Sequence, residues 1–225
     1  MSSPESVKVV LLGQAGVGKT CIISKFITGE FNPNTISSLA AQYISKTMAF
    51  QDKAIKFDIW DTAGQERFRA LAKIFYKDAK VICLCYDITS KESFNELKDY
   101  WYEKQTKLNA NGDPIFAVVA NKNDLYEKAQ VKDEEGKAFA KSINAIFQST
   151  SAKSDSGINS LFENIGKKYF DPNFDSNEEE NKEKLEYEKK KTEKALKKTQ
   201  PQPQSRGVKL DTSKSNNPQK KKSWC

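Results

Sequence analysis

The chain has 225 residues, of which 37% are hydrophobic, and its formal net charge is +7 at pH 7. That length allows one sizeable domain plus an appendage, and the low hydrophobic content indicates that part of the chain lies outside a folded core. With no histidine, no zinc-ligand spacing among its cysteines, no signal sequence and no membrane-length apolar run, the chain excludes the common zinc sites and favours a reducing, cytosolic environment.

The hydrophobic pattern of residues 7–170 alternates between strands and helices. Strands are predicted at 7–12, 43–50, 53–60, 81–88, 115–122 and 145–149, and helices at 18–28, 68–79, 90–108, 131–142 and 156–169. The short turn between the second and third strands predicts a hairpin, and therefore one antiparallel strand. We expect a doubly wound, mostly parallel α/β sheet of six strands that binds its ligand at the strands' C-terminal ends.

A phosphate-binding motif follows the first strand. GQAGVGKT, residues 13–20, fits the pattern G-x-x-x-x-G-K-[ST], whose glycines let backbone amides approach an anion. Lys19 adds a positive charge for the outer phosphates, and the Thr20 hydroxyl is a candidate Mg²⁺ ligand. This predicts a nucleoside triphosphate site. The residues expected to contact the nucleotide here are Gly13, Ala15, Gly16, Val17, Gly18, Lys19, Thr20 and Cys21.

A second motif, DTAGQ at residues 61–65, follows the apolar strand that ends at Trp60. A carboxylate at Asp61 is placed to hold the Mg²⁺ shell. We expect the Gly64 amide to bind the γ-phosphate and Gln65 to orient the attacking water, which makes Gln65 the candidate catalytic residue.

Two further motifs predict the base. NKND occupies residues 121–124 and SAK residues 151–153. Asp124 can accept two hydrogen bonds from guanine that adenine does not offer, and the Lys122 stem can lie across the ring. The candidate base-binding residues are Asn121, Lys122, Asp124, Ser151, Ala152 and Lys153. These motifs predict GTP and GDP as ligands, and with few arginines they weigh against a P-loop kinase.

The motifs together make residues 7–170 resemble the Ras superfamily of small GTPases, and most of all its Rab branch. The Rab resemblance rests on IWDTAGQERF (59–68), KIFYKDA (73–79) and YDIT (86–89). It implies slow GTP hydrolysis that an activating protein accelerates, and a switch in vesicle-mediated membrane traffic. The implied partners are an exchange factor, an activating protein, a GDP-dissociation inhibitor, an escort protein and effectors. A Ras-superfamily GTPase of nuclear transport or signalling is the alternative.

The resemblance also implies roles for single residues. Phe31 falls where an aromatic ring meets the base edge-on, and Ser38 of switch I falls at the second Mg²⁺ ligand, with Ser37 as the alternative. Tyr43, Trp60 and Phe75 fall where Rab proteins contact effectors, although plain packing is the alternative for these three. Leu39-Ala40-Ala41 is similar to the endosomal subgroup, which implies the cytoplasmic face of endosomal membranes.

The last part of the chain has a different character. We expect a flexible N-terminus at 1–6, a GTP-binding domain at 7–170 and a hypervariable tail at 171–225, acidic first and then basic. Residues 177–198 have no apolar stripe, and residues 200–222 read as a disordered linker. Cys225, after KKKSW, is a candidate for prenylation, with an incidental cysteine as the alternative. A prenyl group and nearby lysines together favour an anionic membrane. No aromatics interleave the lysines, so we expect no nucleic-acid partner.

Overall fold

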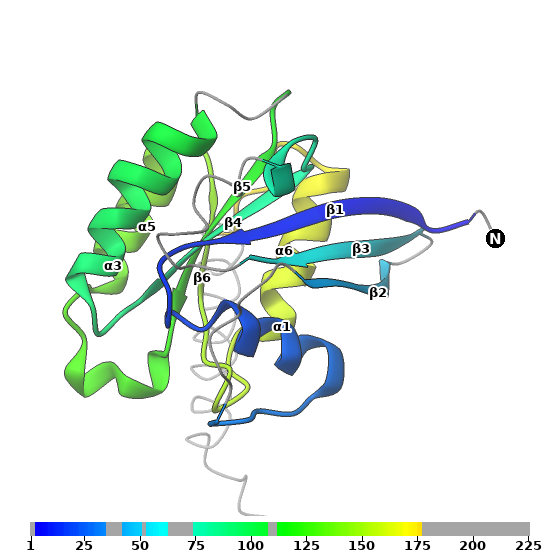
Figure 1. Cartoon of the computed structure of the whole chain (residues 1–225). Helices are drawn as coiled ribbons and strands as arrows, with labels where there is room; N and C mark the ends of the chain where they lie inside the picture. The colour runs from blue at the N-terminus through cyan, green and yellow to red at the C-terminus, as the bar shows by residue number, and fades with distance from the viewer. Residues whose placement is uncertain (1–2, 35–41, 51–52, 63–73, 108–111, 177–225) are drawn as a thin grey trace, which may run out of the picture. The chain divides into compact units, whose positions relative to one another are not determined.

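One six-stranded sheet organises the described part of the chain (Figure 1). The computed structural model describes residues 3–34, 42–50, 53–62, 74–107 and 112–176. The strands are β1 (Glu5–Leu12), β2 (Gln42–Phe50), β3 (Lys53–Asp61), β4 (Val81–Asp87), β5 (Ile115–Asn121) and β6 (Ile146–Ser149), in the spatial order β2-β3-β1-β4-β5-β6. Only β2 and β3 pair antiparallel. The predicted fold class is therefore confirmed, and β1 begins two residues earlier than expected.

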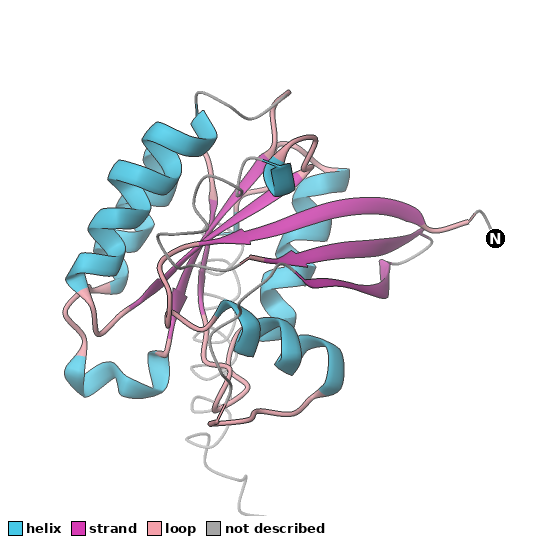
Figure 2. Ribbon diagram, in the orientation of Figure 1, coloured by secondary structure: helices cyan, strands magenta, loops and turns pink. Residues whose placement is uncertain are grey.

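Helices cover both faces of the sheet (Figure 2). They are α1 (Lys19–Thr28), α3 (Lys91–Glu96), the π-helix η2 (Leu97–Thr106), the 3₁₀-helix η3 (Asn123–Lys128), α5 (Asp133–Ser142) and α6 (Ile158–Phe170). Alternate residues of β1 face opposite cores, as strand geometry requires: Val9 and Leu11 pack under α1 and α6, whereas Val10 and Leu12 pack under α3 and α5. Stacked rings of Phe26 and Phe162, with centroids 3.6 Å apart, join α1 to α6.

Two helical segments differ from the prediction. The helix predicted at 90–108 changes from α to π form at Leu97, and the buried Thr106 hydroxyl donates to the carbonyls of Trp101 and Tyr102 at 3.0 and 3.2 Å. The short helix η3 was not expected, because it overlaps the polar NKND motif rather than an apolar repeat. Of the helix predicted at 68–79, residues 68–73 lie outside the described part, and residues 74–76 are helical.

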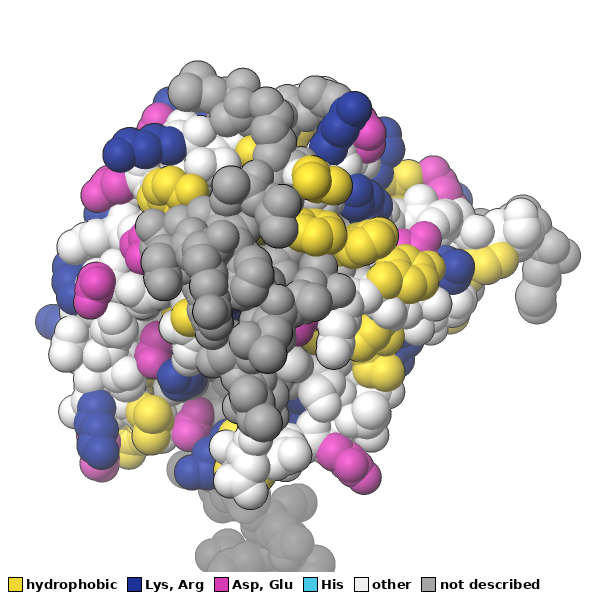
Figure 3. Space-filling view, in the orientation of Figure 1, with side chains coloured by type: hydrophobic (Ala, Val, Ile, Leu, Met, Phe, Trp, Pro, Cys, Tyr) yellow, Lys and Arg dark blue, Asp and Glu magenta, His cyan; other side chains and the backbone are white. Residues whose placement is uncertain are grey.

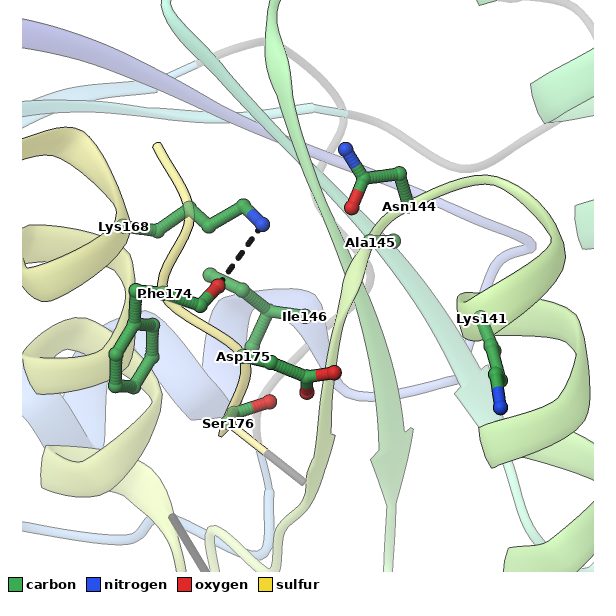
Figure 4. Close-up of a pocket in the computed structure, with 8 residues that line it drawn as sticks. All are labelled: Lys141, Asn144, Ala145, Ile146, Lys168, Phe174, Asp175 and Ser176. Atoms are coloured by element: carbon green, nitrogen blue, oxygen red, sulfur yellow. Dashed lines mark hydrogen bonds between the residues drawn. The ribbon is translucent and has the colours of Figure 1, made fainter. Parts of the chain in front are cut away.

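The folded region continues beyond residue 170, where the tail was expected to begin. The Lys168 ammonium donates to the Phe174 carbonyl at 2.9 Å, and the Lys167 ammonium lies 5.5 Å from the Phe174 ring centre. Residues 174–176 and the turn before β6 line a cavity of about 50 Å³ (Figure 4). Ser176 is buried there. Residues 174–176, which were assigned to the tail, thus pack on the folded region. No helix among the described residues has the length and apolarity needed to cross a membrane.

Candidate functional site

The polar motifs meet at the C-terminal ends of the parallel strands. The phosphate-binding loop follows β1, Asp61 ends β3, Asn121 ends β5, and Ser151 follows β6. Because β1, β3, β4, β5 and β6 run parallel, these ends lie at one edge of the sheet, where doubly wound folds bind ligands. Residues far apart in the sequence therefore form one candidate site.

The phosphate-binding loop depends on glycine geometry at two positions. Gly13 and Gly18 have φ values of +146° and +98°, which side-chain-bearing residues rarely adopt. A Cβ at Gly13 would lie 2.2 Å from the Cys85 carbonyl oxygen, and one at Gly18 would lie 2.3 Å from Nδ2 of Asn121. The loop therefore approaches β4 and the base-binding motif so closely that neither position has room for a side chain.

The Lys19 side chain folds back onto this loop. Its buried ammonium donates to the carbonyl oxygens of Gly13 at 2.8 Å and Gln14 at 3.0 Å. Burial lowers the pKa of Lys19, and the nearby negative charge of Asp61 opposes that shift. A positive charge held mainly by neutral carbonyl groups in a buried place favours a bound anion, because an anion would compensate its lost hydration.

Thr20 and Asp61 supply oxygen donors beside Lys19. The Thr20 hydroxyl donates to Oδ2 of Asp61 at 2.7 Å, and Asp61 is 1% exposed. Within the described part of the chain, no group of three or more His, Cys, Asp or Glu residues could hold a metal. Mg²⁺ prefers this arrangement of one or two protein oxygens, because phosphate and water oxygens complete its shell. The donor set therefore fits Mg²⁺ carried with a nucleotide.

A side-chain hydrogen-bond network links the base-binding motifs. Nδ2 of Asn121 donates to the Val17 carbonyl at 2.8 Å, and its Oδ1 accepts from the Thr150 hydroxyl at 3.1 Å. The Ser151 hydroxyl donates to Oδ1 of Asp124 at 2.6 Å. NKND and SAK are thus joined to each other and to the phosphate-binding loop. Thr150 was not singled out from the sequence, because it matches no short motif.

Other predicted nucleotide contacts are less enclosed or lie outside the described residues. Phe31, Thr20 and Cys21 are half-buried, Ala15, Gly16 and Lys153 are exposed, and Ala152 is buried. Ser37, Ser38, Gly64, Gln65 and Cys225 fall outside the described part of the chain. The structure therefore brings together the predicted phosphate-binding and base-binding groups, whereas the candidate catalytic and lipid-bearing residues stay predictions.

Tyr43, Trp60 and Phe75 lie in a row that we term the aromatic surface. The ring centroids of Tyr43 and Trp60 are 5.4 Å apart, and those of Trp60 and Phe75 are 5.8 Å apart. Tyr43 is 50% exposed, and hydrophobic side chains gather on the face shown in Figure 3. The Tyr43 hydroxyl donates to Oδ1 of Asp58 at 2.6 Å, and Lys8 lies over the Trp60 ring at 5.5 Å. These contacts hold the rings in place while leaving part of their area open.

The buried cysteines have no chemical role in this site. Burial raises the pKa of Cys83 well above its ordinary value and that of Cys85 to about 12. A thiol that stays protonated is a poor nucleophile, so both act as small apolar side chains.

Comparison with known proteins gives one consistent match. Residues 8–171 match the Ras family. The chain is 42% identical over 173 residues to the human Ras-related protein Rab-22A, an alignment that covers 76% of this chain and 86% of the relative. It is 39% identical over 163 residues to Rab5A of Oryza sativa subsp. japonica, covering 72% and 79%, and 40% identical over 161 residues to RabJ of Dictyostelium discoideum, covering 72% and 62%.

Proposed function

The chain belongs to the Ras family of small GTPases and to its Rab type, and from that premise we propose how its residues perform the function. As a member, it binds guanine nucleotide and hydrolyses GTP, with the role in vesicle traffic that the Rab type implies. We propose that it is a switch that binds effectors in its GTP state at the cytoplasmic face of endosomal membranes.

One observation carries this proposal. Strand β3 ends with Trp60 followed directly by Asp61, so adjacent residues belong to the aromatic surface and to the candidate Mg²⁺ site. Side chains of successive strand residues point to opposite faces, and Asp61 is buried beside Thr20 while Trp60 packs between Tyr43 and Phe75. Loss of the γ-phosphate can therefore alter the aromatic surface, which partners can contact, through the adjacent residues Asp61 and Trp60.

We assign the residues of the site to holding Mg²⁺ and the nucleotide and to orienting the attacking water. Thr20, Asp61 and Ser38 would hold Mg²⁺, which supplies charge stabilisation to the phosphates. Lys19 and the loop amides bind the phosphate oxygens, Asp124 selects guanine, and Gln65 orients the attacking water. Ser38 and Gly64 hold their segments only while the γ-phosphate is present, so hydrolysis releases both.

The partners follow from this cycle. We propose an exchange factor to release GDP, and an activating protein to supply the positive charge that the loop before Lys19 lacks, since its residues 13–18 contain no arginine. A GDP-dissociation inhibitor and an escort protein would handle a prenyl group on Cys225. One lipid chain anchors only marginally, and lysines near the end would add about 1 kcal/mol each at an anionic leaflet.

Replacing Gln65 with Leu tests the chemical part. Binding of a fluorescent GTP analogue should stay within about twofold, whereas single-turnover hydrolysis should slow by about tenfold or more, because the water loses its orienting amide. The decrease should be largest with an activating protein present. Hydrolysis at the parent's assisted rate would remove Gln65 from the mechanism.

The membrane part is tested with a fluorescently tagged full chain. The parent should co-localise with endosomal markers, and a Cys225→Ser variant should be cytosolic while binding GTP normally. Mass spectrometry of the membrane-bound pool should find a prenyl mass on the C-terminal peptide. An unmodified Cys225 in that pool would contradict the proposal.

A further inference from the structure

We infer that Asp87 is a positioning residue that holds the Lys122 side chain in the conformation that binds the guanine base. This inference rests on the proposed role of Lys122 and extends it to a residue outside the nucleotide-binding motifs. Asp87 ends β4 and pairs in register with Asn121, which ends β5. The backbone amide of Ile88 donates to the Asn121 carbonyl at 3.1 Å, so the two strand ends stay together beyond the last pair. Lys122, which directly follows β5, therefore lies beside the Asp87 carboxylate at the end of β4.

Both oxygens of that carboxylate are engaged. Oδ2 accepts from the Lys122 ammonium at 2.7 Å. Oδ1 accepts from the Thr89 amide at 2.8 Å and from the Thr89 hydroxyl at 2.7 Å. Asp87 is 9% exposed, and its own backbone amide donates to the Ser93 hydroxyl at 3.1 Å. The carboxylate is thus a fixed anchor rather than a mobile surface group.

Lys122 is held at both ends. Its backbone adopts the left-handed region with φ +66°, unusual for a residue with a side chain, and its carbonyl accepts from the Leu125 amide at 2.9 Å. A free lysine side chain samples many rotamers and loses that freedom on binding. With its ammonium tied to Asp87, the methylene stem has lost much of this freedom before the base arrives. Asp87 therefore contributes to binding by preorganisation.

Lys19 and Lys122 are anchored differently, and the difference matches their ligands. Lys19 donates to neutral carbonyl oxygens and keeps a net charge for phosphates. Lys122 donates to a carboxylate, which neutralises its charge beside a neutral base. The ion pair with Asp87 thus leaves the methylene groups of Lys122 free to pack on the guanine ring, while the ammonium charge is neutralised.

Dissociation of a fluorescent GDP analogue, chased with excess GDP at fixed Mg²⁺, tests this on the full chain. Asp87→Asn should accelerate dissociation about fivefold, the scale of a partly exposed charge pair, and Lys122→Met should accelerate it at least as much. The double variant should be no faster than Lys122→Met, because Asp87 acts through that lysine. Thr89→Val is the matched control: it removes a contact of the same carboxylate but leaves the pair, so its rate should stay within about twofold of the parent.

Each other outcome has a definite meaning. A faster Lys122→Met with an unchanged Asp87→Asn would overturn the positioning role and leave the base assignment intact. An unchanged Lys122→Met would instead contradict the proposed base contact itself. Additive effects in the double variant would show that Asp87 acts by another route. Lys122→Gln removes the charge pair from the other partner; it should match Asp87→Asn, and a parent-like rate would overturn the inference even if Asp87→Asn fails to fold.

Discussion

The two ends of the nucleotide site are built in different ways. At the phosphate end, backbone shape dominates: Gly13 and Gly18 leave no room for a Cβ, and Lys19 is tied to loop carbonyls. At the base end, side chains dominate: the Thr150 hydroxyl donates to Asn121, and the Ser151 hydroxyl donates to Asp124. The ends meet where Asn121 donates to the Val17 carbonyl.

This difference matches the two ligands. Phosphate is recognised by charge and by many backbone donors, so a small error in backbone position affects every contact together. A base is recognised by a few directed hydrogen bonds, so single side chains can be changed and selectivity adjusted. Substitutions at the phosphate end should therefore weaken every guanine nucleotide together. At the base end, a change at Asp124 should alter the preference among nucleotides, and a change at a supporting residue such as Thr150 should have a small effect.

The largest effect is expected from Gly13→Ala. The new Cβ would meet the backbone oxygen of Cys85 and force an unfavourable φ, so nucleotide affinity should fall by about 100-fold or more. Gly16→Ala is the control, since its φ of +80° is also strained but no atom lies within 4 Å of the new Cβ. Calorimetric titration with GDP should show a loss of at most about tenfold for this control. Equal losses in the two variants would contradict the importance of close approach.

A smaller effect at the phosphate end is expected from removing Mg²⁺. Because Thr20 and Asp61 present oxygen ligands there, chelation with EDTA should accelerate GDP release by about tenfold or more. Stopped-flow fluorescence measures the rate, and excess Mg²⁺ should restore it. EDTA should accelerate GDP release by the same factor in a Thr150→Val variant, because Thr150 lies at the base end of the site. No response to EDTA would argue against a metal at this site.

The smallest effect is expected at the base end, from Thr150→Val. The change removes the hydrogen bond to Asn121 while keeping the shape of the side chain. A hydrogen bond of this kind contributes about 1 kcal/mol, so GDP should bind about fivefold more weakly. Calorimetric titration checks the value. A loss as large as that of Gly13→Ala would remove the distinction between the two ends.

The sequence predicts the phosphate end better than the base end. Gly13, Lys19, Thr20 and Asp61 are found from short motifs, because backbone constraints there restrict which residues are possible. Thr150 supports the base-binding motifs through a side-chain contact and belongs to no short motif. Asp87 lies in YDIT (86–89), but that motif does not indicate its contact with Lys122. All six strands are predicted, the hairpin from alternation and the others chiefly from short apolar runs. The helix η3 and the π-helical form of η2 are not predicted, since both depend on local hydrogen bonding.

The most direct test of the account is the nucleotide preference of Asp124→Asn. The parent should prefer GTP over both ATP and XTP, because the carboxylate accepts from the two guanine donors, while Ser151 holds it in place at 2.6 Å. An amide instead presents a donor to xanthine, so the variant should lose GTP affinity by about 100-fold and bind XTP more tightly than GTP. Competition binding with the three triphosphates measures this. Unchanged nucleotide preference in the variant would contradict the assignment of Asp124 to the base.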